Sequence, residues 1–124
     1  MRVLVVDDVR PLALILRQLI EGLGHTAAAA YDGREAIAAA KRFAPDVVLC
    51  DLNLDVGLSG YEVAGQLRAE AALRSVYLVA VSGCEGEEEV QKSLAAGFDA
   101  HLVKPVGVAE LEQVLAVVGD RGAR

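Results

Sequence analysis

The sequence predicts one α/β domain in which a doubly wound, five-stranded parallel sheet carries five helices on its two faces. The first observation is an alternation, since short apolar runs and segments with helical spacing follow one another five times. The second is that most of these runs are continuously apolar, which is typical of strands buried on both faces of a parallel sheet. A length of 124 residues fits one domain, and a hydrophobic content of 54% can supply its core.

Five strands are expected along the chain. They cover about 3–8, 25–30, 47–51, 76–81 and 100–103. The segment 25–30 is the weakest, because its run of alanines also suits a helix. It is assigned as a strand from its context, since it follows Gly22-Leu23-Gly24, a typical helix end.

Five helices are expected between and after these strands. Their apolar faces are predicted, in order, as Leu12, Ile15, Leu19 and Leu23; Ile37 and Ala40; Val63 and Leu67; Val90, Leu94 and Phe98; Val108, Leu111, Leu115 and Val118. The second helix is placed at about 34–43, and the fourth is expected to end at a Gly97 cap. The ordered core is expected to cover about 1–118, with 119–124 as a tail.

The composition argues against several classes of protein. A net charge of −6 and a pI near 4.8 disfavour a nucleic-acid-binding surface, which would show a basic patch. No apolar run approaches the ~20 residues that span a bilayer, and no signal peptide is recognisable, so no membrane partner is expected. Cys50 falls in a buried strand and Cys84 in a loop, without metal-site spacing. A reducing cytoplasm is therefore the expected compartment.

Polar residues suited to phosphoryl chemistry stand where the predicted strands end. Asp7 and Asp8 close the first strand, Asp51 the third and Ser82 the fourth, while Lys104 follows the fifth. Parallel strands place their C-terminal ends at one edge of the sheet, and ligands bind in the crevice outside those ends. The sequence therefore predicts that three carboxylates, a hydroxyl and an ammonium group meet at one place.

Transfer of a phosphoryl group to a carboxylate needs positioning and positive charge rather than covalent help from the protein. A hard cation such as Mg²⁺ suits this chemistry and prefers carboxylate, carbonyl and water oxygens. Each residue also has a structural explanation. Asp8 could cap the first helix, Lys104 could be a solvated charge, and Ser82 could form a turn before Gly83. Their occurrence together at four strand ends favours the site.

Four segments, in order, resemble the motifs of one family. They are Val-Leu-Val-Val-Asp-Asp (3–8), Asp-Val-Val-Leu-Cys-Asp (46–51), Val-Ala-Val-Ser-Gly (79–83) and Ala-Gly-Phe-Asp-Ala-His-Leu-Val-Lys-Pro (96–105). Over essentially all of residues 1–124, the chain resembles a receiver domain of two-component response regulators, of the chemotaxis type. The resemblance implies a flavodoxin-like sheet with strand order 2-1-3-4-5 and a cis peptide bond between Lys104 and Pro105.

The resemblance also implies a role for each residue of the site. Asp51 would accept a phosphoryl group from the phosphohistidine of a histidine kinase or a histidine phosphotransfer protein, giving 4-aspartylphosphate. Asp8, Asp51 and the backbone carbonyl of Asn53 would hold Mg²⁺ directly, and Asp7 would act through water. Lys104 would pair with the Asp51 carboxylate and then with the phosphoryl group.

The same resemblance implies how the signal leaves the site. Ser82 would move toward the phosphoryl group, and His101 stands where the family usually carries a rotating aromatic side chain. The surface of the fourth helix, fifth strand and fifth helix would then change its binding to an unknown downstream protein. Asn53 and Cys84 occupy positions that tune dephosphorylation in similar proteins. Such a chain is a signalling phosphoacceptor rather than a turnover enzyme, and it is not expected to encode a DNA-binding or catalytic output domain.

The chain departs from the family pattern in two places. The family usually has a proline in the loop after the phosphorylated aspartate and a glycine eight positions beyond that aspartate. Here Asp55 stands near the expected proline and Gly60 lies nine positions after Asp51, so residues 52–59 carry one extra residue. We expect Asp55 to face solvent at the rim of the metal site. The other departure is His101, which is either a half-buried edge-strand residue or a pH-sensitive switch.

Two other functions remain open from the sequence. One is a pseudo-receiver that docks partners without phosphorylation, which the altered loop permits. The other is a phosphatase of the haloacid-dehalogenase type, whose motif carries a second acid two residues after the nucleophile. Asp51-Leu52-Asn53 lacks that general acid/base. A flavodoxin-like nucleotide binder is disfavoured, because no strand is followed by a phosphate-binding loop.

Overall fold

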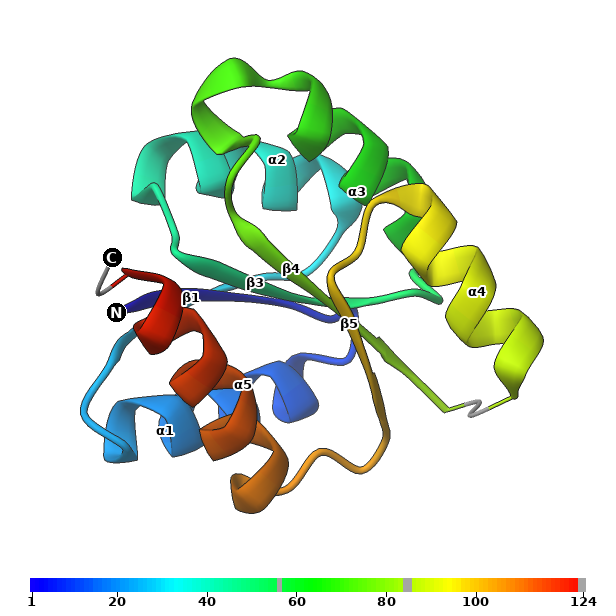
Figure 1. Ribbon diagram of the computed structural model, residues 1–124. Coiled ribbons are helices and arrows are strands. Elements are labelled where there is room, and N and C mark those ends of the chain that lie inside the picture. The colour runs from blue at the N-terminus through cyan, green and yellow to red at the C-terminus, as the bar shows by residue number, and fades with distance from the viewer. Residues whose placement is uncertain (56, 84–85, 123–124) are drawn as a thin grey trace.

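The computed structural model describes residues 1–55, 57–83 and 86–122, which form one parallel sheet with helices on both faces (Figure 1). The strands are β1 (Arg2–Val6), β2 (Thr26–Ala30), β3 (Val47–Asp51), β4 (Tyr77–Ser82) and β5 (Ala100–Val103). The helices are α1 (Arg10–Gly22), α2 (Gly33–Phe43), α3 (Gly60–Ala69), α4 (Glu87–Ala96) and α5 (Val108–Gly122), with a 3-10 turn, η1 (Ala71–Leu73). The sheet order is β2-β1-β3-β4-β5, which confirms the predicted fold class.

The core consists of two apolar layers separated by the sheet. Alternate strand side chains point to opposite faces, so Leu4 and Val48 join the layer under α2 and α3, while Val3 and Val47 join the layer under α1 and α5. All of these valines and leucines are buried. Continuous apolar runs were therefore a sound indication of strands covered on both faces.

The apolar face predicted for the first helix is partly wrong. Leu12 and Ile15 are 42% and 52% exposed, whereas Ala13 and Ile20 are fully buried and Leu16 packs against the same core. Residues 11–16 are apolar on nearly every side, so spacing alone could not select the buried face. The selected face carries the small Ala13, which allows α1 to lie close to the sheet.

Two predicted core positions in the later helices are also exposed. In α4, Ser93 rather than Leu94 is buried, and the Ser93 hydroxyl donates a hydrogen bond to the Val90 carbonyl at 2.8 Å. This bond satisfies the hydroxyl inside the protein, which makes burial of a serine acceptable. In α5, Val108 is exposed because it begins the helix, and the buried face starts at Leu111.

Helix α5 continues to Gly122, so residues 119–122 are helical where the sequence predicted a tail. The apolar repeat ends at Val118, and Gly119 and Asp120 are exposed. The apolar pattern therefore ends before the helix does, which explains the difference. A Cβ atom on Gly119 would lie 3.6 Å from the Met1 side chain, so this turn still lies against the first residue.

Two predicted chain features are confirmed, the first being Gly97, which caps α4 in the left-handed conformation. The structure adds a cap on α2, where the Asp32 side chain accepts a hydrogen bond from the Glu35 amide at 2.8 Å. The peptide bond between Lys104 and Pro105 is cis. Within the part of the chain that the structure describes, no helix has the length and apolarity needed to cross a membrane.

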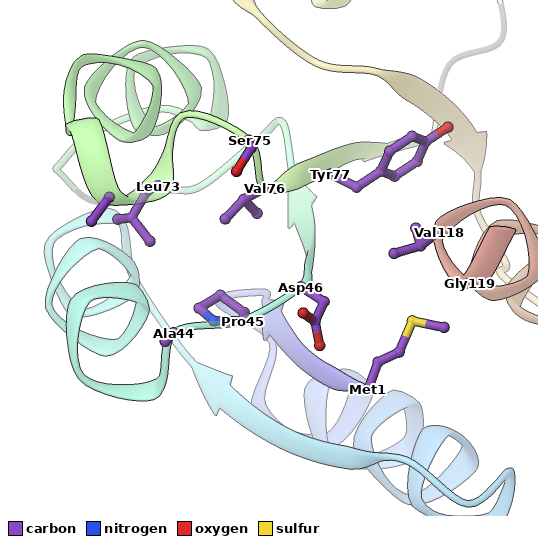
Figure 2. A pocket seen from close by; sticks show the side chains of 11 residues that line it. Met1, Ala44, Pro45, Asp46, Leu73, Ser75, Val76, Tyr77, Val118 and Gly119 are labelled. Carbon is purple, nitrogen blue, oxygen red and sulfur yellow. The ribbon is translucent and has the colours of Figure 1, made fainter. Parts of the chain in front are cut away.

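A cleft of about 500 Å³ lies at the N-terminal ends of the strands (Figure 2). Asp46 and Val76, which directly precede β3 and β4, line it together with Met1 and Val118. The Asp46 carboxylate already accepts a hydrogen bond from the Arg2 amide at 2.8 Å. This cleft is at the opposite edge of the sheet from the polar strand ends, so it is not part of the candidate site.

Gly60 begins α3 where the helix touches the end of β3. A Cβ atom there would collide with the Asp51 carbonyl oxygen and would lie only 2.6 Å from the Leu52 Cα. The same turn is held by a capping box, in which Ser59 and Glu62 exchange side chain-to-backbone hydrogen bonds. Glycine is therefore required at residue 60 for close packing beside Asp51.

We predict that Gly60→Ala lowers the free energy of unfolding by about 2 kcal/mol, because the collision displaces α3 from the sheet. Gly65→Ala is the matched control, since that glycine lies in the same helix and a Cβ atom there meets nothing within 4 Å. The control should raise stability by up to ~1 kcal/mol through helix propensity. Urea unfolding followed by circular dichroism measures both, and equal effects in the two variants would contradict the assignment.

Candidate functional site

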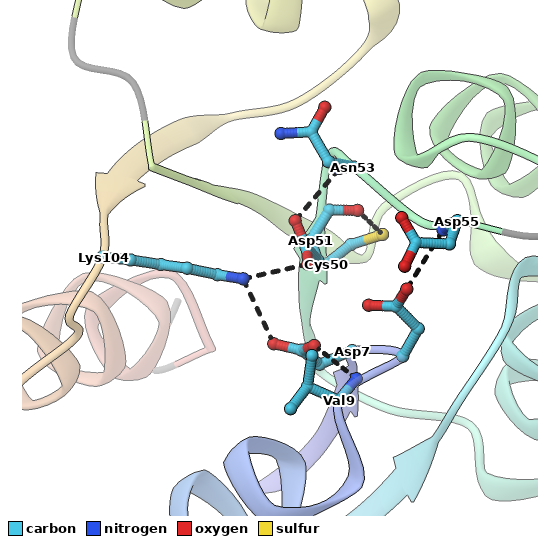
Figure 3. A network of polar contacts seen from close by, with 8 residues as sticks. Asp7, Val9, Cys50, Asp51, Asn53, Asp55 and Lys104 are labelled. Atoms are coloured by element: carbon cyan, nitrogen blue, oxygen red, sulfur yellow. Dashed lines mark hydrogen bonds and ion pairs between the residues drawn. The ribbon is translucent and has the colours of Figure 1, made fainter.

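The candidate site lies at the C-terminal ends of β1, β3 and β5 (Figure 3). Val6 of β1 is in register with Cys50 of β3, so the next residue of each strand, Asp7 and Asp51, lies at the same edge. The carboxylate oxygens of Asp7, Asp8 and Asp51 come within 4.8 Å of one another. The predicted convergence of the three acidic residues is therefore what the strand register produces.

Lys104 reaches this cluster from the end of β5. Its Nζ lies 2.9 Å from Asp51 Oδ2 and 3.4 Å from Asp7 Oδ2. Burial by itself would lower the pKa of Lys104, but the hydrogen bond and attraction of Asp51, aided by Asp7, outweigh it and raise that pKa. The lysine is thus fully cationic at neutral pH and belongs to the site rather than to the solvated surface.

Two of the carboxylates are also held by backbone amides close to them in sequence. The Val9 amide donates to Asp7 Oδ1 at 2.9 Å, and the Asn53 amide donates to Asp51 Oδ1 at 3.0 Å. Asp7 is buried, and this burial raises its pKa, with the neighbouring Asp51 charge acting in the same direction. The Val9 amide and Lys104 oppose the rise without cancelling it.

Asp8 does not cap the first helix. The residue before α1 is Val9, which makes no side-chain cap, and the Asp8 Oδ2 instead accepts a hydrogen bond from the Asp55 amide at 3.1 Å. Asp55 is exposed, as predicted, and its pKa is raised by a hydrogen bond to Asp8 and by the charge of Asp8. The loop with the extra residue therefore contacts the acidic cluster through Asp55.

The donor set fits a hard divalent cation. Three carboxylates from two neighbouring strands supply the oxygen ligands that Mg²⁺ prefers, and Lys104 neutralises only part of their charge. Asn53 lies directly beside Asp51 and is exposed, at the open side of the cluster. The residues present are thus chemically suited to the cation that the sequence predicted.

The residues predicted for signalling lie around this cluster. Ser82 is buried at the end of β4, and its carbonyl accepts a hydrogen bond from the Lys104 amide at 2.8 Å. His101 is half-buried in the edge strand β5, with its Nδ1 3.2 Å from the Ser93 hydroxyl of α4. Cys84 lies outside the described residues. Their switching and tuning roles stay predictions.

Cys50 is a core residue, as predicted. Burial raises the pKa of its thiol, and the nearby acidic charges act in the same direction. Its sulfur donates a weak hydrogen bond to the Asp51 carbonyl oxygen at 3.4 Å. A buried thiol held in its protonated form is unreactive, so Cys50 contributes packing rather than chemistry.

An apolar cleft beside the site was missed by the sequence analysis. It has a volume of about 400 Å³ and contains Asp7 and Lys104 of the polar cluster. Its apolar lining comes from α1, β4 and the segment after β5: Leu12, Ile15, Leu16, Val81, Pro105 and Val106. Leu12 and Ile15 were misassigned to the core. The sequence did contain a sign of this cleft, because the first helix carries more apolar residues than one buried face can hold.

The family follows from a comparison with known sequences. A family model for the response regulator receiver domain matches residues 3–116. The chain belongs to the response regulator receiver family. Its predicted sheet order and the strand-end cluster are thus those of a domain used in two-component signalling.

Curated relatives of the receiver domain belong to longer proteins. Virulence sensor protein BvgS of Bordetella pertussis is 40% identical over 128 residues, which cover 99% of this chain and 10% of that protein. DNA-binding response regulator MtrA of Mycobacterium tuberculosis is 36% identical over 110 residues, covering 89% of this chain and 46% of MtrA. The chain thus corresponds to 10% of the length of BvgS and 46% of the length of MtrA. Because MtrA is named as DNA-binding, the acidic charge of this domain does not support excluding nucleic acid as a partner.

A solved structure shows the same fold with a metal. The receiver domain of sensor histidine kinase PA1611 from Pseudomonas aeruginosa matches with a TM-score of 0.86 and 28% identity, covering 95% of this chain and 97% of that one. That structure is described as having a magnesium ion coordinated in the active-site cleft. The likeness agrees with the chemistry of the acidic cluster in this receiver domain.

We predict that Asp7→Asn stabilises the metal-free receiver domain at pH 7 by on the order of 1 kcal/mol. The raised pKa of Asp7 means that its ionised form opposes folding, and this cost builds up as the pH rises from the ordinary value of 3.8 to the raised folded-state pKa. Thermal and urea unfolding in the presence of a chelator would measure the gain, which should vanish below pH 3.8.

The same variant provides a second readout. Adding MgCl₂ should raise the melting temperature of the wild type more than that of Asp7→Asn, because a ligand that binds the folded state stabilises it. A variant that is less stable than the wild type at pH 7 without metal would show that the Lys104 contact outweighs the burial of Asp7.

Proposed function

We propose that this receiver domain is a phosphoacceptor in which Asp51 takes a phosphoryl group from a histidine kinase or a histidine phosphotransfer protein. One observation carries the proposal: the Lys104 ammonium lies 2.9 Å from the Asp51 carboxylate, inside a cluster of three acidic residues. A buried carboxylate beside a cation is placed to attack phosphorus, and the cation can then offset the negative charge of the phosphoryl group.

In the proposed transfer, an Asp51 oxygen forms a bond to phosphorus while the bond between phosphorus and the donor imidazole nitrogen breaks. The imidazole leaves with the bonding electrons and takes up a proton, and Asp51 becomes an acyl phosphate. Lys104 is a mobile point charge, so it can follow the negative charge from the carboxylate to the phosphoryl oxygens. The Asn53 amide holds the second carboxylate oxygen and orients Asp51.

Mg²⁺ would be held by Asp8, Asp51 and the Asn53 backbone carbonyl directly and by Asp7 through water. When bound, it would supply positive charge to the phosphoryl oxygens. The fit of the donor set and the magnesium ion described for the PA1611 receiver domain support this proposal. Asp7 would add negative charge close to the cation, and its carboxylate also contacts Lys104 at 3.4 Å.

The proposed switch runs from the site to the face formed by α4, β5 and α5. The Ser82 hydroxyl and Lys104 would move toward the phosphoryl group, and the hydrogen bond between their backbones joins β4 to β5. His101, on the same strand β5, contacts Ser93 of α4. Exposed apolar side chains at Leu94 and Val108 give this face a surface for a downstream protein.

Under this proposal the domain is a signalling component of the cytoplasm, and it catalyses only its own phosphorylation and dephosphorylation. The family match does not favour a haloacid-dehalogenase phosphatase. A pseudo-receiver, which would bind partners without phosphorylation, is separated from the proposal by the first experiment below.

We expect acetyl phosphate with Mg²⁺ to add one phosphoryl group to the wild type and none to Asp51→Asn, as read by intact mass. Omitting Mg²⁺ should reduce the adduct strongly, because the remaining cation, Lys104, neutralises only part of the charge. No adduct on the wild type, even with a phosphorylated histidine donor, would identify a pseudo-receiver. An adduct of equal size on the variant would show that a residue other than Asp51 accepts the phosphoryl group.

The apolar cleft between α1 and the segment after β5 gives the phosphoryl donor a docking surface. It reaches Asp7 and Lys104, so a protein bound there would place a histidine next to Asp51. Exposed Ile15 and Leu12 form its wall on α1. A donor helix that carries apolar residues beside its phosphohistidine is the occupant that matches an apolar surface ending in a cationic group.

We predict that Ile15→Lys slows transfer from a phosphorylated histidine phosphotransfer domain about tenfold, because the charge removes an apolar docking contact. Labelling by acetyl phosphate, which does not need that surface, should remain unchanged. Leu14→Lys is the matched control, because Leu14 lies on the same helix, is 44% exposed and does not line the cleft. Equal slowing by both variants would argue against this docking surface.

A further inference from the structure

We propose that Asp55, the residue beside the extra position in the loop after β3, is a positioning residue for the cation site. Its backbone amide fixes the carboxylate of Asp8, while its own carboxylate stays outside the set of ligands. The inference rests on the proposed function, since it names a residue that controls how the acidic cluster binds a divalent cation.

Each of the three carboxylates in the cluster is held by one backbone amide. Asp7 and Asp51 are held by amides two residues further along the chain, at Val9 and Asn53. Asp8 differs, because its amide donor comes from Asp55, 47 residues away in the loop after β3. Among the described residues, Lys104 pairs with Asp7 and Asp51 but not with Asp8. The orientation of Asp8 therefore depends on this loop.

The identity of the residue matters because the interaction uses a backbone N–H group. A proline, which the resemblance makes usual in this part of the loop, has no N–H and could not donate to Asp8. The hydrogen bond from Asp55 to Asp8 is exposed, so water competes for the Asp8 carboxylate. The donor must therefore be positioned by the backbone of the loop. The substitution of Asp55 near the proline position thus supplies a contact that proline would lack.

The Asp55 carboxylate makes a contact of its own to Asp8, in addition to the hydrogen bond from the amide. It is exposed, and the oxygen cluster that could hold a cation contains Asp7, Asp8 and Asp51 without Asp55. In Figure 3 the Asp55 carboxylate points from the loop toward the cluster and lies at its rim. A charge at such a place attracts cations through solvent, and salt screens that attraction over about 8–10 Å. Its contribution should therefore fade at high ionic strength.

Two variants separate the amide from the charge. Asp55→Ala removes the carboxylate and keeps the amide, whereas Asp55→Pro removes both. We would titrate each protein with MgCl₂ and follow the amide resonances by ¹H–¹⁵N NMR at low and at high NaCl. For Asp55→Ala we expect an affinity two- to fivefold below that of the wild type at low salt and equal to it at high salt. For Asp55→Pro we expect a further loss of about tenfold that persists at both salt concentrations.

A second measurement guards against a proline variant that perturbs the loop for other reasons. In Asp8→Ala, the Asp55 amide proton should move upfield and exchange faster with solvent, because its acceptor is gone. The Asn53 amide, which donates to Asp51, is the internal control and should keep its position. Resonances at the opposite edge of the sheet, such as those of Thr26 and Tyr77 at the starts of β2 and β4, should be unchanged in every variant, which shows that the fold is retained.

The outcomes separate this inference from the proposed function. A wild type that binds no Mg²⁺ would overturn the proposed function. A wild type that binds Mg²⁺, with Asp55→Pro equal to Asp55→Ala at both salt concentrations, would overturn the positioning role alone. An Asp55 amide that does not respond to Asp8→Ala would overturn it as well. The expected pattern in both measurements would establish Asp55 as the residue that orients Asp8.

Discussion

The contact between Lys104 and Asp51 is the interaction on which the site depends. Asp7 and Asp51 are almost completely buried beside each other, with Asp8 in reach, and such like charges repel strongly in a region shielded from water. Lys104 brings one compensating charge, which leaves a net charge of about −2 when all four groups are ionised. A divalent cation would balance that charge, which is why the donor set of the cluster suits one.

The parallel sheet turns this local chemistry into a connected structure. Strands β1, β3 and β5 each end at the site, and the Lys104 amide is bonded to the Ser82 carbonyl of β4. The same β5 carries His101, which contacts Ser93 on α4. A displacement of Lys104 toward a phosphoryl group would act on the strand that supports the α4 surface. In the proposed switch, chemistry and output would share a strand, which would reduce the number of parts that must move.

Much of this could be predicted from the sequence because its physical origin is local. A continuously apolar run such as residues 47–50 has apolar side chains on both faces of its strand, so both faces must be buried. The polar residue that follows then lies at the edge of the sheet. The buried face of α1 could not be predicted, since residues 11–16 are apolar all round. The bond from Asp55 to Asp8 was also hidden, because a backbone donor from a distant loop leaves no trace in side-chain patterns.

The errors of the sequence analysis are themselves informative about function. Leu12 and Ile15 fit a helical core pattern but remain exposed next to Asp7 and Lys104. Contiguous exposed apolar side chains often mark a surface that another protein covers, so their place beside Asp7 and Lys104 supports the proposed docking surface. A conflict between the helical core pattern and the observed exposure tends to occur at functional sites. The exposure of Leu12 and Ile15 therefore agrees with their proposed role in docking a phosphoryl donor.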